Sequence, residues 1–202
     1  MKIAIDLNDV VRDYSANFLK YYLEGYNRTF DLTDFEFWSH DLMAVFPFSS
    51  QASYYNFIYN DYAFELYGKC ETCSRKLTER LNDWIEKTIK EVDVPFDIDV
   101  MFVSTKEYGL SIGNTYYFIS KLGVKVREVY FPIDQSTIWD KCDVLITANP
   151  ELLAIKPEDK ISIKIETDYN KNSDSDFSFN SLDEFITDQD NIKKLNWSGN
   201  DE

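Results

Sequence analysis

The sequence predicts an α/β fold: a three-layer, doubly wound parallel sheet with an all-helical cap inserted after its first strand. Five short apolar runs alternate with helix-like segments, and runs that are apolar on both faces are typical of central strands in a parallel sheet. A long segment between the first two runs shows no strand-like alternation and exceeds a single crossover helix. The expected strands are Ile3–Leu7, Val100–Ser104, Val124–Tyr130, Asp143–Thr147 and Ile161–Ile165.

The inserted segment shows three helix signals. Asp13–Glu24 is expected to form a helix that Gly25 closes, and Thr33–Glu36 is a capping box that opens another helix. Ser74–Val92 carries apolar residues at helical spacing with charged residues on the opposite side. We therefore expect residues 13–95 to form a helical cap above the sheet.

The remaining residues complete the core. Asn114–Leu122 is expected to be a helix because Gly123 follows it as a C-cap, and Ser181–Glu184 is a capping box that opens a closing helix. The predicted domains are an α/β core of residues 1–12 and 96–195, the cap of residues 13–95, and a tail of residues 196–202.

Composition excludes several classes of protein. The chain has 202 residues and a formal net charge of −15, so its surface repels nucleic-acid backbones and anionic lipid. Three cysteines are too few for a disulfide framework, and no apolar run reaches the length of a membrane span. The first residues do not resemble a signal peptide. We expect a soluble, cytoplasmic protein that binds neither nucleic-acid polymers nor membranes.

Polar residues follow three of the predicted strands. They are Asp6-Leu7-Asn8-Asp9, Ser104-Thr105 and Thr147-Ala148-Asn149-Pro150. Because ligands of open α/β sheets bind at the carboxyl ends of the strands, these residues are the candidates for a functional site.

Six segments, in order along the chain, resemble the haloacid dehalogenase (HAD) superfamily, and within it the 5′(3′)-deoxyribonucleotidase group. They are IAIDLNDVVRDYSANFLKYY, DFEFWSHDL, FVSTKEYG, NTYYFISKLGV, CDVLITANPELL and IKIETDYN with the later FNSLDEF. The resemblance implies a Rossmann-like core with a cap and Mg²⁺-dependent phosphate chemistry. In that chemistry, one Asp attacks phosphorus, a second Asp transfers protons, a Ser or Thr and a Lys hold the phosphate, and a further acidic residue completes the metal site.

Carried over by position, the resemblance is incomplete. Asp6 stands at the nucleophile and metal position, and Ser104, or else Thr105, at the phosphate-holding hydroxyl. Asn8 stands at the acid/base position, where its amide has no transferable proton, although its backbone carbonyl remains a metal-ligand candidate. Asn114 stands at the Lys position.

Thr147 stands at the acidic metal position, so the proton carrier, the cation and one metal carboxylate are all missing. We interpret Asn114 as a helix N-cap. Neighbours that could substitute are Lys106, Lys121 and Lys125 for the cation, and Asp9, Asp13, Asp140 and Glu151 for the carboxylate.

We expect a catalytically impaired relative of the nucleotidases, retained for binding a phosphorylated small molecule or a protein partner that the sequence does not identify. One alternative is a weak Mg²⁺-dependent phosphomonoesterase acting on (deoxy)nucleoside monophosphates. A second alternative is an interaction protein with a vestigial pocket. Mg²⁺ binding is expected to be weak or absent.

Two features of the predicted cap have ordinary interpretations. Cys70 and Cys73 form a CxxC with no second pair of ligands, so we expect reduced cysteines and no zinc. The cap aromatics are expected to form core and cap–sheet contacts, with one or two facing a ligand. They are Tyr54, Tyr55, Phe57, Tyr59, Tyr62, Phe64 and Tyr67.

Overall fold

A computed structural model of the protein describes residues 1–26, 36–90, 98–188 and 190–195. Its centre is a six-stranded sheet in the order β3-β2-β1-β4-β5-β6, and every neighbouring pair of strands is parallel. The strands are β1 (Lys2–Asp6), β2 (Asp99–Val103), β3 (Glu128–Tyr130), β4 (Val144–Thr147), β5 (Ile161–Ile165) and β6 (Phe177–Phe179).

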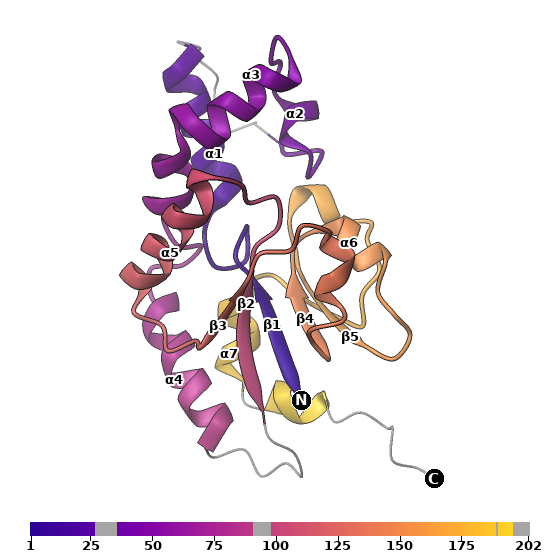
Figure 1. Ribbon diagram of the computed structural model, residues 1–202. Coiled ribbons are helices and arrows are strands. Elements are labelled where there is room, and N and C mark those ends of the chain that lie inside the picture. The colour runs from indigo at the N-terminus through magenta and orange to yellow at the C-terminus, as the bar shows by residue number, and fades with distance from the viewer. Residues whose placement is uncertain (27–35, 91–97, 189, 196–202) are drawn as a thin grey trace.

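The strand order reverses at β1, which lies between β2 and β4 (Figure 1). Asp6 is in register with Val103 of β2, and Ile5 is in register with Ile146 of β4. The residues that follow these three strands therefore meet at one edge of the sheet. Such a reversal point is where ligands of doubly wound sheets bind.

Alternation along each strand divides the core between the two faces of the sheet. Ile3 and Ile5 of β1 belong to a large apolar cluster on one face, and Ala4 belongs to a smaller cluster on the other. The first face is covered by α4 (Leu77–Lys90), α5 (Leu110–Leu122), α7 (Leu182–Thr187) and α8 (Asp190–Lys194). The second is covered by η4 (Gln135–Ile138) and α6 (Pro150–Ala154). The three-layer α/β prediction is confirmed.

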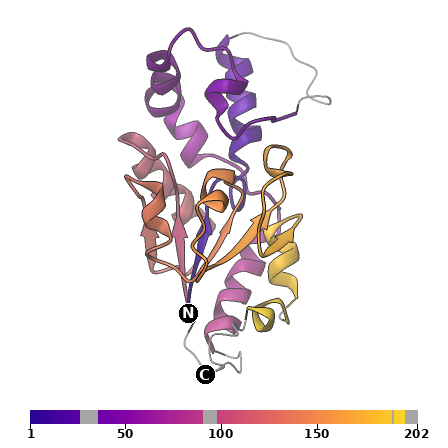
Figure 2. The same cartoon turned by 90° about the vertical axis from the view of Figure 1, so that its right-hand side faces the viewer.

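The inserted segment forms a cap beyond the carboxyl ends of the strands (Figures 1 and 2). It consists of α1 (Tyr14–Tyr26), α2 (Leu42–Val45), α3 (Gln51–Asn56) and the short helices η2 (Phe57–Asp61) and η3 (Phe64–Gly68). The cap has its own aromatic core, in which Phe18 contacts Phe46 and Phe57 with ring centroids 5.0 and 5.3 Å apart. None of the described helices combines the length and apolar character needed to cross a membrane.

Helix α4 lies elsewhere than expected. We placed it in the cap above the sheet, but its stripe of Leu77, Leu81, Trp84 and Ile85 belongs to the core cluster on the sheet face. The Trp84 ring lies 5.8 Å from the ring of Phe185 in α7. The periodicity correctly predicted an amphipathic helix, but a stripe of apolar residues does not specify which surface it packs against.

Other boundaries differ from the predictions by a few residues. Strand β3 is shorter than residues 124–130, β6 was not predicted, and α1 continues through Gly25. The N-cap role of Ser181 is confirmed, because its hydroxyl accepts a hydrogen bond from the Glu184 backbone N–H at 3.1 Å. The expected capping box at residues 33–36 falls mostly outside the described residues.

Candidate functional site

Asp6 ends β1 at the reversal point of the sheet, and its side chain is buried. Its Oδ2 accepts a hydrogen bond from the hydroxyl of Thr147, the last residue of β4, at 2.8 Å. That hydroxyl in turn accepts a hydrogen bond from the backbone N–H of Asn149 at 3.0 Å. The structure thus brings the predicted nucleophile and the predicted metal position together, with a hydroxyl where a carboxylate would coordinate metal.

Burial raises the pKa of Asp6 from its ordinary value of 3.8 to about 7. The Thr147 hydroxyl, the Asn8 backbone and the Arg12 charge all lower this pKa, and the charge of Asp9 raises it slightly. Desolvation outweighs the three stabilising contacts because a carboxylate loses most of its hydration when it is enclosed by protein.

This pKa predicts a pH-dependent stability. Between about pH 4 and pH 7 the native state retains a proton that the unfolded state releases, so stability falls as pH rises through that window. Asp6→Asn removes the titration and should gain stability over wild type with rising pH, by up to about 4 kcal/mol above pH 7. Urea unfolding at pH 4.5 and pH 8 in EDTA measures this gain. The exposed carboxyl variant Asp140→Asn is the control, and a pH-independent Asp6→Asn difference would contradict the assignment.

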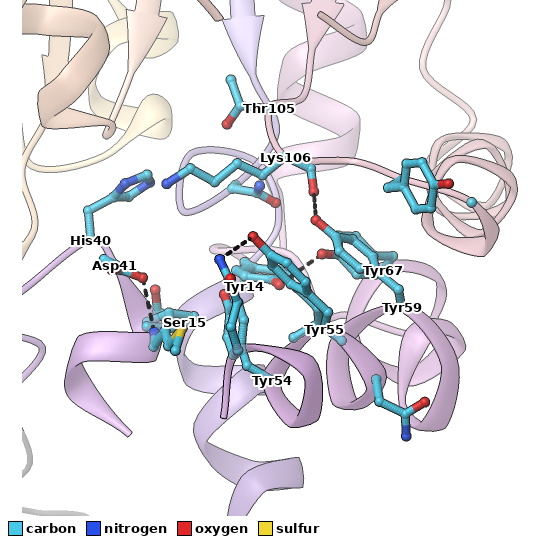
Figure 3. A pocket seen from close by; sticks show the side chains of 18 of the residues that line it. Tyr14, Ser15, His40, Asp41, Tyr54, Tyr55, Tyr59, Tyr67, Thr105 and Lys106 are labelled. Carbon is cyan, nitrogen blue, oxygen red and sulfur yellow. Dashed lines mark hydrogen bonds between the residues drawn. The ribbon is translucent and has the colours of Figure 1, made fainter. Parts of the chain in front are cut away.

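A cavity of about 1130 Å³ lies between the cap and the carboxyl edge of the sheet. Five tyrosines from the cap line it, namely Tyr14, Tyr54, Tyr55, Tyr59 and Tyr67 (Figure 3). From the sheet side, Asn8, Thr105 and Lys106 reach the cavity, whereas Asp6 is not among the lining residues. The predicted nucleophile therefore lies behind the cavity wall.

Charged and polar groups gather at one end of this cavity. The Lys106 ammonium points toward His40 and lies 3.7 Å from a Glu151 carboxylate oxygen (Figure 3). Burial, and then the Lys106 charge, lower the pKa of His40 below its usual range, so the imidazole is neutral at neutral pH. The Lys106 backbone carbonyl accepts a hydrogen bond from the Tyr59 hydroxyl at 2.5 Å, which joins the cap to the sheet.

The two candidate phosphate-holding hydroxyls lie in different surroundings. Thr105 lines the cavity. Ser104 is fully buried, and its hydroxyl donates to Glu107 Oε1 at 2.8 Å and accepts from Arg12 Nη2 at 3.1 Å. The Ser104 hydroxyl is thus engaged by the protein's own charged side chains.

Arg12 is a buried charged residue of the candidate site that the sequence analysis did not single out. Its guanidinium is completely buried, forms an ion pair with Glu107 at 2.5 Å, and donates to the Thr115 hydroxyl at 2.7 Å. Its carbon Cζ lies 5.0 Å from the centre of the Tyr67 ring. The sequence does show an arginine close after the first strand, between two valines and Asp13. It was not considered because only lysines were weighed as replacements for the missing cation.

Asn8 and Asn114, the two asparagines at positions where the resemblance implies catalytic residues, have different surroundings. The Asn8 side-chain oxygen accepts a hydrogen bond from Arg12 Nε at 2.6 Å, so the amide at the acid/base position supports the arginine. Asn114 is not an N-cap: α5 begins at Leu110 after Gly109, which places Asn114 in the helix interior. The N-cap residue is Gly109, which has no side chain to accept a hydrogen bond from the first turn, and its φ of 59° is a conformation that glycine adopts readily.

The residues at the predicted metal position do not fit a magnesium site. Mg²⁺ requires several oxygen ligands, usually including one or two carboxylates. Asp6 Oδ1 is buried without a hydrogen-bond partner among the described residues and could be one ligand, but Oδ2 is bonded to Thr147, which offers only a neutral hydroxyl where a second carboxylate is needed. Within the described ranges, no group of three His, Cys, Asp or Glu side chains is placed to hold a metal ion. The carboxylate missing from the sequence pattern is therefore also missing from the site.

Three of the four neighbouring carboxylates named as possible replacements, Asp9, Glu151 and Asp140, lie in different surroundings. Asp9 accepts hydrogen bonds from the Ser15 backbone at 2.7 Å and from the Tyr169 hydroxyl at 2.9 Å. Glu151 accepts one from Gln135 at 2.6 Å, and Asp140 is exposed.

The two cysteines of the CxxC differ in exposure, and both are free thiols. Cys70 is buried, its thiol donates to the Asp13 carbonyl at 3.3 Å, and burial raises its pKa to about 12. A thiol with this pKa is a poor metal ligand at neutral pH. The expectation of no zinc stays a prediction, which metal analysis of the purified protein would test.

Comparison with known proteins identifies the fold. No family model matches the chain, and no curated protein matches it. A putative haloacid dehalogenase-like hydrolase from Burkholderia xenovorans LB400 superposes with a TM-score of 0.59 at 8% identity, over 93% of this chain and 95% of that chain. A dehalogenase solved with an intermediate complex gives a TM-score of 0.50 at 10% identity, over 91% and 94% of the two chains. The chain therefore has the fold of the HAD-like hydrolases.

Proposed function

We propose that this protein is a catalytically impaired relative of the 5′(3′)-deoxyribonucleotidases that binds a small aromatic ligand between its cap and its sheet. The observation that carries this proposal is the separation of the cavity from Asp6. The cavity is large and lined by tyrosines, while the Asp6 carboxylate is buried behind it and bonded to Thr147.

The geometry supports binding better than turnover. A nucleophile must lie within about 3–3.5 Å of the atom it attacks, and Asp6 does not reach the cavity. Asn8 supplies no transferable proton at the acid/base position, and general acid–base catalysis alone is worth roughly 10²–10⁴-fold in rate. A phosphate ester in this cavity would therefore be held without being hydrolysed at a useful rate.

The tyrosines favour a ligand with an aromatic ring. Tyr55 is 45% exposed, lines the cavity, and lies outside the buried core of the cap. Stacking of a nucleobase on an aromatic side chain is worth about 1–3 kcal/mol. Nucleosides and nucleoside monophosphates, the ligand class that the resemblance implies, are therefore suitable probes.

Calorimetric titration with a panel of these probes tests the proposal. We expect at least one probe to bind, and Tyr55→Ala to weaken its binding by roughly tenfold because one stacking surface is lost. Tyr116→Ala is the matched control, because Tyr116 is 51% exposed and does not line the cavity. Failure of every probe to bind, or an equal loss in both variants, would contradict the proposal.

A further inference from the structure

Glu107 directly follows Thr105 and Lys106, two residues that line the cavity. Its side chain is completely buried, and one of its oxygens, Oε1, accepts three hydrogen bonds. The donors are Arg12 at 2.5 Å, Ser104 at 2.8 Å and Thr115 at 2.8 Å. They come from the loop after β1, from the end of β2 and from α5, so three separate parts of the fold converge on one oxygen atom.

The second oxygen of the same carboxylate has a different environment. Oε2 of Glu107 is buried and has no hydrogen-bond partner within the described part of the chain. Buried charged oxygens are normally bonded, so this arrangement is not the one expected if the donors had been placed to satisfy a glutamate side chain. A cation and two hydroxyls around one point form a donor set suited to an oxyanion.

We propose that Glu107 is an internal anion that occupies an oxyanion-binding site formed by Arg12, Ser104 and Thr115. A carboxylate or phosphate from solution can enter this site only when the Glu107 carboxylate is removed. The inference holds whether or not the cavity binds a ligand, and it adds a cause of impaired activity that is independent of Asp6.

The donors should keep their positions when Glu107 is truncated. Arg12 is also held by Asn8 at 2.6 Å and by the Tyr67 carbonyl at 3.3 Å, so it has anchors besides the carboxylate. The two residues between Ser104 and Glu107 in the sequence, Thr105 and Lys106, line the cavity. We therefore expect truncation at position 107 to leave a charged space that a small anion can reach from the cavity.

Thermal unfolding of Glu107→Ala in different salts at equal ionic strength tests the proposal. In chloride the variant should lose roughly 10 °C in Tm, because the Arg12 charge is left buried without a partner. In formate, which replaces the carboxylate, Tm should rise by roughly 3–5 °C for each tenfold increase in concentration above Kd. Inorganic phosphate should act in the same direction.

Two variants test whether the formate effect depends on the emptied space and on the Arg12 charge. Glu107→Gln fills the same space without charge, so it should gain no more from formate than from chloride. The double variant Arg12→Met/Glu107→Ala lacks the cation and should likewise show no preference for formate. Equal behaviour of Glu107→Ala in formate and chloride, measured as Tm or as refolding yield, would overturn the proposal.

Wild-type protein provides a test that does not depend on the folding of any variant. Because Glu107 fills the site, ³¹P NMR titration with inorganic phosphate at millimolar concentration should show no binding that Ser104→Ala weakens. Phosphate binding to wild type that is lost in Ser104→Ala would show that the donors are free and would also overturn the proposal.

Discussion

Arg12→Met is expected to lower the free energy of unfolding by about 3–5 kcal/mol, because it leaves the Glu107 carboxylate buried without its partner. For a chain of this size, this loss corresponds to a fall in Tm of roughly 10 °C or more. The methionine fills a comparable volume, so the loss comes mainly from the charge and its hydrogen bonds to Asn8 and Thr115. Urea or thermal unfolding measures the effect.

Two further variants show whether the lost stability comes from the buried charge pair. Arg80 forms a partly exposed ion pair with Asp183 at 3.5 Å, so Arg80→Met should cost no more than about 1 kcal/mol. Arg12→Met/Glu107→Met removes both buried charges and should recover much of the stability lost in the single variant. An Arg12→Met protein as stable as Arg80→Met would contradict the buried pair.

If the protein is catalytically impaired as proposed, efficient phosphatase activity should require several substitutions at once. Asn8→Asp returns a proton carrier, Thr147→Asp returns a carboxylate beside Asp6, and Glu107→Ala frees Ser104 and Arg12 to hold a phosphate. Groups that act as a unit have strongly non-additive effects. We expect the triple variant to hydrolyse phosphate monoesters with Mg²⁺ roughly 10²-fold or more faster than any of the three single variants, which requires that loss of the Thr147 hydroxyl and of the Glu107 side chain opens a path from the cavity to Asp6.

The single variants should stay near background for identifiable reasons. Asn8→Asp places a carboxylate against Arg12, and Thr147→Asp places a second negative charge against Asp6, which should raise its pKa further. Adding Asp6→Asn to the triple variant is the control and should abolish its activity. A single variant as active as the triple variant would show that the other groups were already in place.

The sheet could be predicted from the sequence because most of its strands are short runs rich in apolar and β-branched residues. Ile161–Ile165 was predicted with the bounds of β5, and the strand-end positions of Asp6, Ser104 and Thr147 placed three site residues at one edge. Strand β6 was missed because it has only three residues, Phe177–Phe179, and none of them is fully buried. A short edge strand leaves too weak a periodic signal.

The charged part of the site could not be predicted from local pattern. Arg12 is separated from Ser104 by 92 residues and from Thr115 by 103, and no local periodicity encodes contacts across such separations. By sequence position, the missing lysine would stand at Asn114. In the structure the cation beside Ser104 is Arg12, and the helix residue that contacts it is Thr115, next to Asn114. The partner of the α4 stripe was unpredictable for the same reason.

Phosphatase assays of wild type and Asp6→Asn test most directly whether the HAD-like fold has been retained without its chemistry. Purified protein would be incubated with Mg²⁺ and p-nitrophenyl phosphate or deoxynucleoside monophosphates, and phosphate release would be compared between the two proteins. Because Asp6 is buried behind the cavity and bonded to Thr147, we predict equal rates that do not exceed background. Robust Mg²⁺-dependent turnover by wild type that Asp6→Asn abolishes would contradict the account.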